Sequence, residues 1–208
     1  MSFLEVILGT HDAGGISLVG GALALDFANT AGGRSLSEPS EHLHTPADVV
    51  DWSMHAGAAD AATAVRAAAA IAKDSDEGAK LLRHGVQLRE AIHRAGMAIA
   101  HGEDAATADL DIVKDFARKA IAAAALVPAD AGYAFDFSGA PTEFALLGQV
   151  AWSAIELLQH GRLDRLKECP GEDCGWLFID TSKNGSRRWC DMATCGNRSK
   201  VNRHRHRH

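Results

Sequence analysis

Hydrophobic residues recur at steps of three and four along most of the chain beyond residue 45, and this spacing predicts amphipathic helices. Thr45 before Pro46 predicts the start of one helix, because proline is favoured at the first helical position. Asp60 predicts the N-cap of a second, alanine-rich helix. The sequence after Asp74 predicts a longer helix that has one buried face and ends near Gly102. The positions on this face are Leu81, Gly85, Leu88, Ile92, Ala95 and Ile99.

The remainder of the long N-terminal part predicts two more helices and a few short strands. The helices are expected over residues 107–126 and 141–160, and the alternating stretch "GYAFDFSG" predicts a strand. Residues 1–29 are expected to form strands or loops, because their apolar runs are short and are separated by glycines. We therefore expect a mainly α fold, with an alanine-rich multihelical domain over residues 1–161.

All the cysteines of the chain lie close together, at Cys169, Cys174, Cys190 and Cys195. They form two pairs with four residues inside each pair, and fifteen residues separate the pairs. This spacing is typical of a structural zinc site, in which each pair occupies two corners of a tetrahedron. Disulfides, which belong to oxidising compartments, and free structural thiols are the alternatives. We expect one structural Zn²⁺, whose four thiolate ligands leave no position for catalysis.

The segment between the cysteine pairs is predicted to fold back as a β-hairpin. "WLFID" has the aromatic and branched residues of a strand, Asn184-Gly185 is a hairpin-turn signal, and "RRWC" returns to the second pair. Residues 162–208 are therefore predicted to form a zinc-ribbon-like hairpin module that ends in a short helix, for which Asn197 is a candidate N-cap. We place the boundary with the helical domain at residues 160–168, where an apolar stripe gives way to charge.

The composition is that of a folded, soluble protein, with 47% hydrophobic and 23% charged residues. The sequence has no apolar run long enough for a membrane span and no basic region typical of a secretory signal, so we expect a cytoplasmic protein without a membrane partner. Residues 1–161 carry 10 Lys+Arg against 21 Asp+Glu, whereas residues 162–208 carry 11 against 6. A basic end on an acidic body favours contact between that end and a polyanion.

The C-terminal stretch also resembles a known family. Residues 174–205, "CGWLFIDTSKNGSRRWCDMATCGNRSKVNRHR", are similar to the CGNR zinc finger, named for the tetrapeptide found here at residues 195–198. Upstream, "LALDFANT" at residues 23–30 and "LRE" at residues 88–90 resemble motifs of the alanine-biased ABATE domain, to which that family joins the finger. The resemblance implies a four-cysteine zinc module after a helical domain, and a stress-related transcription regulator that binds nucleic acid.

The basic end offers several candidate nucleic-acid contacts, namely Arg187, Asn197, Arg198, Lys200, Arg203 and Arg205. On a final helix, the later basic residues point in nearly all directions and cannot all face one protein core. We expect phosphate contacts from the cations and base contacts from Asn197 or Arg198, with DNA before RNA. Alternatively, these arginines balance the negative charge of a zinc ion held by four thiolates, a role that Arg188 beside Trp189 fits best.

The long helical domain shows no catalytic constellation in its sequence, so we expect no enzymatic activity. Its candidate ligand pocket is a group of polar residues at the edge of an apolar segment, Asp26, Asn29, Thr30 and Arg34. The same side chains are equally suited to capping a helix and bonding backbone groups.

Together these patterns favour a zinc-containing transcription regulator that binds nucleic acid through its C-terminal module. The helical domain would sense a small molecule or form a homodimer. The alternative is a small-molecule-binding or enzymatic helical protein in which the zinc module is only a structural clasp, and a third interpretation is an adaptor that docks another protein on its zinc hairpin. Exposed tryptophans beside a basic face would favour the first interpretation, and Trp176 and Trp189 buried against the body would favour the second.

Overall fold

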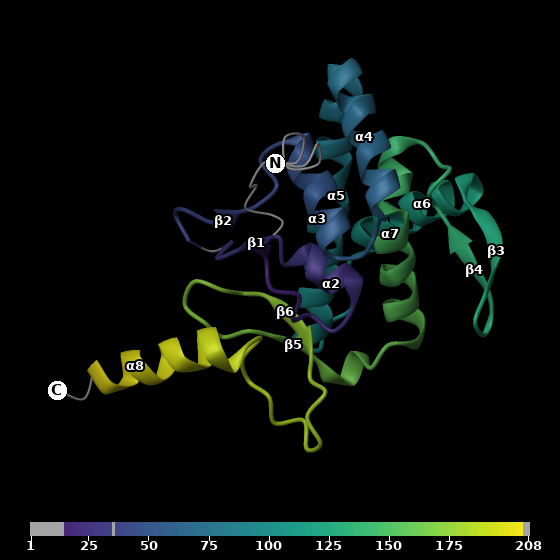
Figure 1. The fold of residues 1–208 in the computed structure, drawn as a ribbon. Helices are drawn as coiled ribbons and strands as arrows, with labels where there is room; N and C mark the ends of the chain where they lie inside the picture. Colours follow the sequence, from purple (N-terminus) through teal and green to yellow (C-terminus); the bar gives the residue numbers. More distant parts are fainter. Residues whose placement is uncertain (1–14, 35, 206–208) are drawn as a thin grey trace.

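The computed structural model describes residues 15–34 and 36–205, and within them the expected mainly α fold is confirmed (Figure 1). The helices are α2 (Leu23–Ala28), α3 (Pro46–His55), α4 (Ala61–Lys73), α5 (Ser75–Ala100), α6 (Thr107–Ala123), α7 (Thr142–His160) and α8 (Asn197–Arg205), with a short 3-10 helix η2 (Leu163–Arg165) and a short π-helix η3 (Met192–Gly196). The antiparallel strand pairs are β1 (Ala31–Gly32) with β2 (Ser40–Glu41), β3 (Ala125–Ala129) with β4 (Gly132–Asp136), and β5 (Leu166–Glu168) with β6 (Leu177–Ile179). In these described ranges, no helix combines the length and the hydropathy needed to cross a membrane.

Side-chain caps begin the first long helices at the predicted residues. The Thr45 hydroxyl accepts the N–H of Asp48, and the Asp48 carboxylate accepts the N–H of Thr45 at 2.6 Å, which closes a capping box on α3. Asp60 accepts the N–H of Thr63 at 2.7 Å at the start of α4. The carboxylate of Asp74 accepts N–H groups from the first turn of α5. These local bonds satisfy N–H groups that a helix end leaves without partners.

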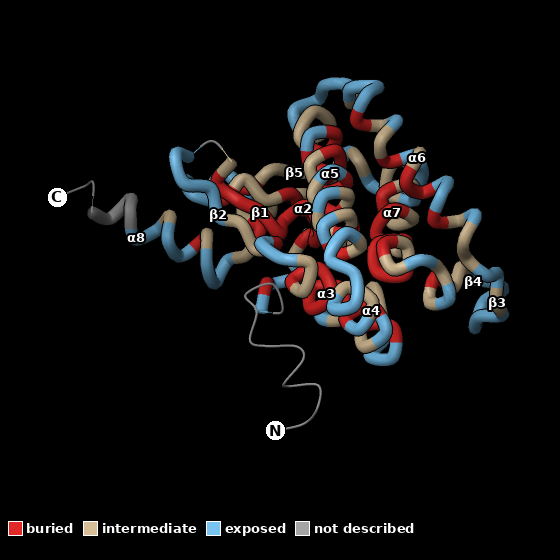
Figure 2. Tube along the Cα trace, turned by 90° about the horizontal axis from the view of Figure 1, so that it is seen from above, coloured by how far each residue is buried: buried red, intermediate tan, exposed pale blue. Residues whose placement is uncertain are grey.

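Helix α5 runs through the middle of the fold and contacts α2, α3, α4, α6 and α7. Its predicted apolar face is buried from Leu81 to Ala95, and Ile99 at its end is half-buried. Figure 2 shows buried residues concentrated where α2, α3, α5 and α7 meet, with exposed residues on the outer turns. The core of the helical domain therefore forms around α5, as the three- and four-residue spacing predicts.

Two predictions about the helical domain are wrong. Residues Leu23–Ala28 form a buried helix and not a strand or loop, because a short continuous apolar run does not distinguish a strand from a buried helix. Helix α6 ends at Ala123, three residues before the predicted end, because Ala125–Ala129 pairs with β4. Pro128 lies in that two-stranded sheet, where an edge strand tolerates proline. The strand expected in "FLEVIL" lies outside the described residues.

The C-terminal part joins the helical body through the residue that follows α2. The buried Asn29 side chain donates from Nδ2 to the carbonyl oxygen of Leu177 at 2.9 Å, and its Oδ1 accepts the N–H of Leu177 at 2.8 Å. This amide thus takes the place of a neighbouring strand on the open edge of β6. The N–H of Ile179 donates to the carbonyl oxygen of Gly20 at 2.8 Å. On α5, a Cβ at Gly96 would lie 2.6 Å from the Leu177 side chain, so glycine permits this close approach.

Replacing Asn29 by leucine keeps a side chain of similar size and removes both bonds to Leu177. A buried polar group left without a partner costs about 1–3 kcal/mol, so we expect the free energy of unfolding to fall by about 2–4 kcal/mol. Urea denaturation followed by circular dichroism measures this change. Asn184→Leu, in an exposed turn, is the matched control and should change the stability by less than about 0.5 kcal/mol. Unchanged stability of Asn29→Leu would show that this amide does not hold the two parts together.

Candidate metal centre

The first cysteine pair lies in the turn that joins β5 to β6. Cys169 directly follows β5, and its N–H donates to the carbonyl oxygen of Trp176 at 2.8 Å, which extends the β5–β6 ladder. Within the turn, the N–H of Cys174 donates to the carbonyl oxygen of Gly171 at 3.1 Å. Gly175 has a φ of 67°, in the left-handed region that glycine adopts readily, and so leads the chain from the turn into β6.

The second cysteine pair lies at the start of the final helix. Asp191 follows Cys190, and its Oδ1 accepts the N–H of Ala193 at 2.9 Å to cap η3. Helix η3 carries Cys195 and runs directly into α8. The prediction that Asn197 caps this helix is therefore wrong, because Asn197 has helical backbone angles and its Nδ2 donates to the carbonyl oxygen of Ala193 at 3.1 Å.

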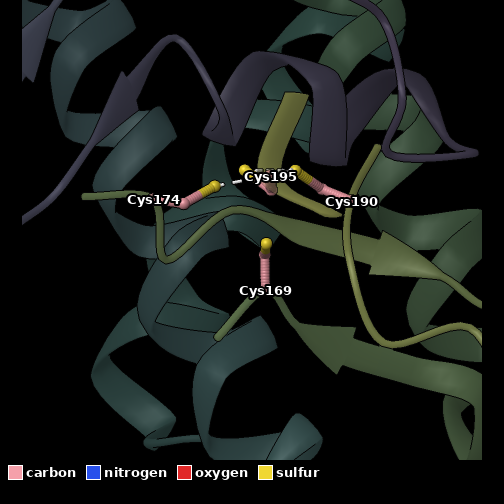
Figure 3. Close-up of side chains that lie close together, drawn as sticks. All are labelled: Cys169, Cys174, Cys190 and Cys195. Atoms are coloured by element: carbon pink, nitrogen blue, oxygen red, sulfur yellow. Dashed lines mark hydrogen bonds between the residues drawn. The ribbon is translucent and has the colours of Figure 1, made fainter. Parts of the chain in front are cut away.

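The four cysteine sulfurs form one cluster, and Figure 3 shows their side chains converging on it. All four Sγ atoms lie within 4.8 Å of one another, with Cys174 Sγ 3.6 Å from Cys190 Sγ and Cys190 Sγ 3.7 Å from Cys195 Sγ. A disulfide needs about 2.05 Å, so these cysteines are not oxidised to one another. Sulfurs about 2.3 Å from a tetrahedral zinc ion are about 3.8 Å apart, close to the two measured separations.

The pKa values of Cys169, Cys174 and Cys190 show that these three thiols do not all carry a negative charge unaided. Hydrogen bonds from the side chains of Cys174 and Cys190 lower the pKa of Cys169 to about 2. The hydrogen bond with Cys169 raises the pKa of Cys174 to about 12, and bonds with Cys169 and Cys174 raise the pKa of Cys190 above its ordinary value. Of these three, Cys169 is therefore anionic while Cys174 and Cys190 retain protons, unless a bound cation compensates the charge of further thiolates.

Zinc fits this donor set. Its preferred structural site consists of four cysteine or histidine ligands in a tetrahedron, and here the ligands would be Cys169, Cys174, Cys190 and Cys195. Backbone N–H groups of Gly171 and Trp176 donate to the sulfurs of Cys169 and Cys174, as outer-shell donors do in thiolate sites. The module thus has one structural zinc site, in which four thiolates leave no open position for a reacting water.

The segment between the cysteine pairs departs from the predicted hairpin. "WLFID" contributes the strand β6, but its partner is β5, and residues 187–190 form no strand. The hairpin therefore surrounds the first cysteine pair and not Asn184-Gly185. A turn does form at the predicted place, where Gly185 has a φ of 62° and its N–H donates to the carbonyl oxygen of Ser182 at 3.2 Å.

Asp180 holds the chain in this turn. Its buried carboxylate accepts the N–H of Ser182 at 2.8 Å, the N–H of Arg187 at 3.0 Å and the Lys167 ammonium at 2.6 Å. Burial alone would raise the pKa of Asp180, but the hydrogen bonds from Lys167 and Ser182 hold it well below its ordinary value. The ionised carboxylate therefore fixes the path that brings Cys190 to the cluster.

The two neighbouring arginines of the returning segment differ in how many contacts they make within the fold. The Arg187 guanidinium lies over the Phe178 ring, 4.5 Å from its centroid, and donates to the carbonyl oxygens of Trp189 and Cys190. These contacts engage its donors within the fold, and a phosphate contact from Arg187 stays a prediction. Arg188 is exposed, with its guanidinium 5.8 Å from the Trp189 ring centroid. Arg188 is thus the better placed of the two for a partner.

The other candidate nucleic-acid contacts all lie on α8, namely Asn197, Arg198, Lys200, Arg203 and Arg205. The first three are exposed. Arg198 Nη1 lies 3.4 Å from Asp173 Oδ2, but both side chains are more than half exposed, so this ion pair is weak. The structure thus collects these residues on one element next to the metal site.

The four residues of the candidate ligand pocket each bond within the fold. Asp26 accepts a backbone N–H at 2.8 Å, and Asn29 pairs with β6. Thr30 donates to a backbone carbonyl at 2.8 Å, and Arg34 donates to two backbone carbonyls and to Glu90. These contacts correspond to the backbone-bonding alternative, and a ligand role for the four stays a prediction.

Two buried polar residues of α5, Arg89 and His93, were not identified from the sequence as structural contacts. Arg89 is 3% exposed and donates to Glu41 at 2.5 and 2.7 Å and to Glu90 at 2.8 Å. One turn further along α5, His93 Nε2 lies 3.3 Å from the carbonyl oxygen of Gly175. Periodicity is the signal that could have found both residues, because they fall on the face of α5 that apolar spacing predicts as buried.

Burial, followed by the charge of Arg34, lowers the pKa of His93 to about 4. A histidine in the unfolded chain titrates near about 6.5, so between these pH values the unfolded chain binds a proton that the folded chain does not. Stability therefore falls as the pH falls through this interval, by about 2–3 kcal/mol from this group. We expect His93→Gln, which cannot be protonated, to lose less stability than the wild type between pH 7 and 4.5.

Urea titrations at the two pH values measure the His93 effect. His160→Gln, at an exposed position, is the control and should lose stability in parallel with the wild type. A parallel loss in His93→Gln would mean that His93 is not held neutral in the folded protein.

Metal analysis of the purified protein should give about one zinc per chain, and Cys174→Ser should lose most of it, because serine does not supply a thiolate. The near-ultraviolet circular dichroism of the nearby tryptophans should weaken in parallel. Thr194→Ser, an exposed change between the last two cysteines, should retain the zinc. Wild-type protein that contains no metal and has four freely titrating thiols would contradict this assignment.

Comparison with known families agrees with the geometry of the site. Residues 165–208, which include all four cysteines, match the family described as "CGNR zinc finger". Residues 21–161, more than half of the chain, match the ABATE family, described as "Putative stress-induced transcription regulator". No curated protein sequence matches the chain. The resemblance seen in the short motifs is thereby confirmed, and the chain belongs to the ABATE family and carries a C-terminal CGNR zinc finger.

Proposed function

We propose that this protein is a transcription regulator that binds nucleic acid, DNA before RNA, through its zinc module. The observation that carries the proposal is the position of α8, which projects away from the helical body in both views (Figures 1 and 2). The helix has no acidic residue, and Ser199 is the only half-buried side chain among residues 197–201. A short basic helix that has no core to pack on is only marginally stable by itself, and a polyanion that neutralises its charge stabilises it.

The zinc site would set the direction of this helix. Cys195 lies on η3, which continues directly into α8, so a metal bond to its sulfur fixes the helix at its base. The module is in turn held to the body by the bonds of Asn29 to Leu177 and of His93 to Gly175. A helix that is fixed at one end and exposed along its length suits the major groove, as in other DNA-binding modules.

Different residues of α8 would make different contacts. Lys200 would contact phosphates of the duplex, which supplies affinity that depends little on sequence and strongly on salt. Asn197 lies in the first turn and has a side chain that reads base edges in the major groove. These contacts support nucleic-acid binding as the mode of action. Catalysis at the metal is not expected, because four thiolates leave the zinc no open coordination position.

A ligand-sensing role for the helical domain is supported by a hollow of about 380 Å³ between α5, α6 and α7. Its apolar side is formed by residues that include Phe116 and Phe144, and His84 at its edge is bonded through Nδ1 to Glu143 at 2.6 Å. A small molecule with an apolar part and a polar group fits such a lining. Because α5 carries both His84 and His93, the same helix connects this hollow with the zinc module.

Anisotropy titrations of a labelled DNA duplex across salt concentrations test nucleic-acid binding. Several phosphate contacts predict a steep loss of affinity with salt, and Lys200→Gln should weaken binding to all sequences alike and reduce the salt slope by about one. Lys119→Gln, on α6 away from the module, is the charge-matched control and should leave the slope unchanged. Absence of binding to both DNA and RNA at low salt would overturn the proposed function.

A further inference from the structure

Two hollows lie on the zinc module, on either side of the turn that holds the first cysteine pair. The smaller, about 290 Å³, is lined by Glu172, Trp189, Cys195, Arg198 and Ser199. The larger, about 480 Å³, is lined by residues that include His101, Lys167, Glu168, Arg187 and Arg188. Pro170 and Gly171 line both, so the two hollows meet across this turn. We call the combined depression the knuckle groove.

Trp189 lines the smaller hollow and packs beside the cysteine cluster. A Cβ at Gly196 would lie 2.9 Å from the Met192 side chain and 3.3 Å from the indole Cδ1, so glycine lets η3 pass close to the edge of the ring. The ring is half-buried. The Arg188 guanidinium lies over this ring, 5.8 Å from its centroid, so the exposed part of the indole and this cation together offer a surface on which a planar group can stack.

An exposed arginine lines each of the two hollows. Arg188 lines the larger hollow and Arg198 the smaller, and both are exposed. The other cations of the larger hollow are already engaged, because Lys167 bonds to Asp180 and Arg187 to backbone carbonyls. The groove therefore presents an aromatic ring near two exposed guanidinium groups, of which Arg188 lies over the ring and Arg198 makes only a weak ion pair with Asp173, and this arrangement matches a base with its phosphates.

A paired base is a poor fit to this arrangement. Within a duplex, the faces of a base are covered by its neighbours in the stack, so stacking on a protein side chain requires an unpaired nucleotide. The smaller hollow is also lined by Arg198 and Ser199, which belong to the first turn of α8, so the groove opens at the base of the helix proposed to contact the duplex.

We propose that the knuckle groove binds a short unpaired segment of nucleic acid, with one base stacked on Trp189 and the flanking phosphates at Arg188 and Arg198. The inference rests on the proposed function and narrows its partner to a duplex that adjoins an unpaired strand. Helix α8 contacts the phosphates of the duplex, and the groove takes the strand that leaves it.

Anisotropy titrations of the full-length, zinc-loaded protein test the groove with two DNA probes, a blunt duplex and the same duplex with a short single-stranded overhang. Stacking of one base predicts about tenfold tighter binding of the overhang probe. Trp189→Leu should reduce this preference to about one while leaving the affinity for the blunt duplex unchanged. Trp152→Leu, on α7 away from the module, is the matched control and should keep the preference.

Because Trp189 packs beside the cysteines, the zinc content of its variant is measured first. Arg188→Gln supplies a second variant at an exposed position, and it should weaken binding of the overhang probe more than that of the blunt duplex. A third probe, the same duplex with an RNA overhang, shows whether the groove prefers unpaired DNA or unpaired RNA. The DNA overhang is expected to bind at least as tightly as the RNA overhang.

The outcomes separate the groove from the proposed function. Equal affinity of the wild type for the blunt and overhang probes, or an unchanged preference in zinc-loaded Trp189→Leu, overturns the groove and leaves duplex binding intact. Binding to single strands without binding to the duplex retains the groove and overturns the role of α8. Binding to none of the probes at low salt overturns both.

Discussion

The crowding of four sulfur atoms within 4.8 Å of one another is the constraint on which the C-terminal module depends. Neighbouring thiols at this distance do not all ionise by themselves, since Cys169 raises the pKa of Cys174, and both raise the pKa of Cys190. A zinc ion compensates the negative charge of the thiolates and connects four pieces of chain: the end of β5, the turn before β6, the segment after the Asp180 turn, and η3. Apart from the cysteines, Phe178 is the buried hydrophobic residue of this cluster, so the module has a very small hydrophobic core. The bound metal therefore supplies most of the stability that a larger core would give.

The module is also part of the helical domain's structure and not an independent appendage. Asn29 completes the edge of β6, Leu177 packs against Gly96 of α5, and His93 reaches Gly175 next to a zinc ligand. These contacts show that the part of the module up to β6 packs on the body, as the clasp interpretation expects. That interpretation does not account for α8, which continues past the last packed residue and carries exposed basic side chains into solvent. Recognition of a polyanion explains this extension, whereas a clasp alone leaves it without a role.

Local signals allowed much of the fold and the metal ligands to be predicted from the sequence. Thr45, Asp60 and Asp74 mark helix starts because a cap and its N–H groups lie within a few residues of one another. The cysteine spacing is a similarly compact signal. The partner of β6, by contrast, depends on the body: the three-residue strand β5 carries a weak pattern of its own, and the Asn29 contact spans 148 positions. The contacts of Arg187 could not be predicted for the same reason, because the Phe178 ring under its guanidinium belongs to another element.

The central claim is that one zinc ion, held by four thiolates, fixes both the joint with α5 and the base of α8. X-ray absorption at the zinc edge of the purified protein tests it most directly, because the spectrum reports the identity, number and distance of the ligands. The account predicts a single shell of four sulfurs at about 2.3 Å. A shell that contains nitrogen or oxygen, or fewer than four sulfurs, would contradict it.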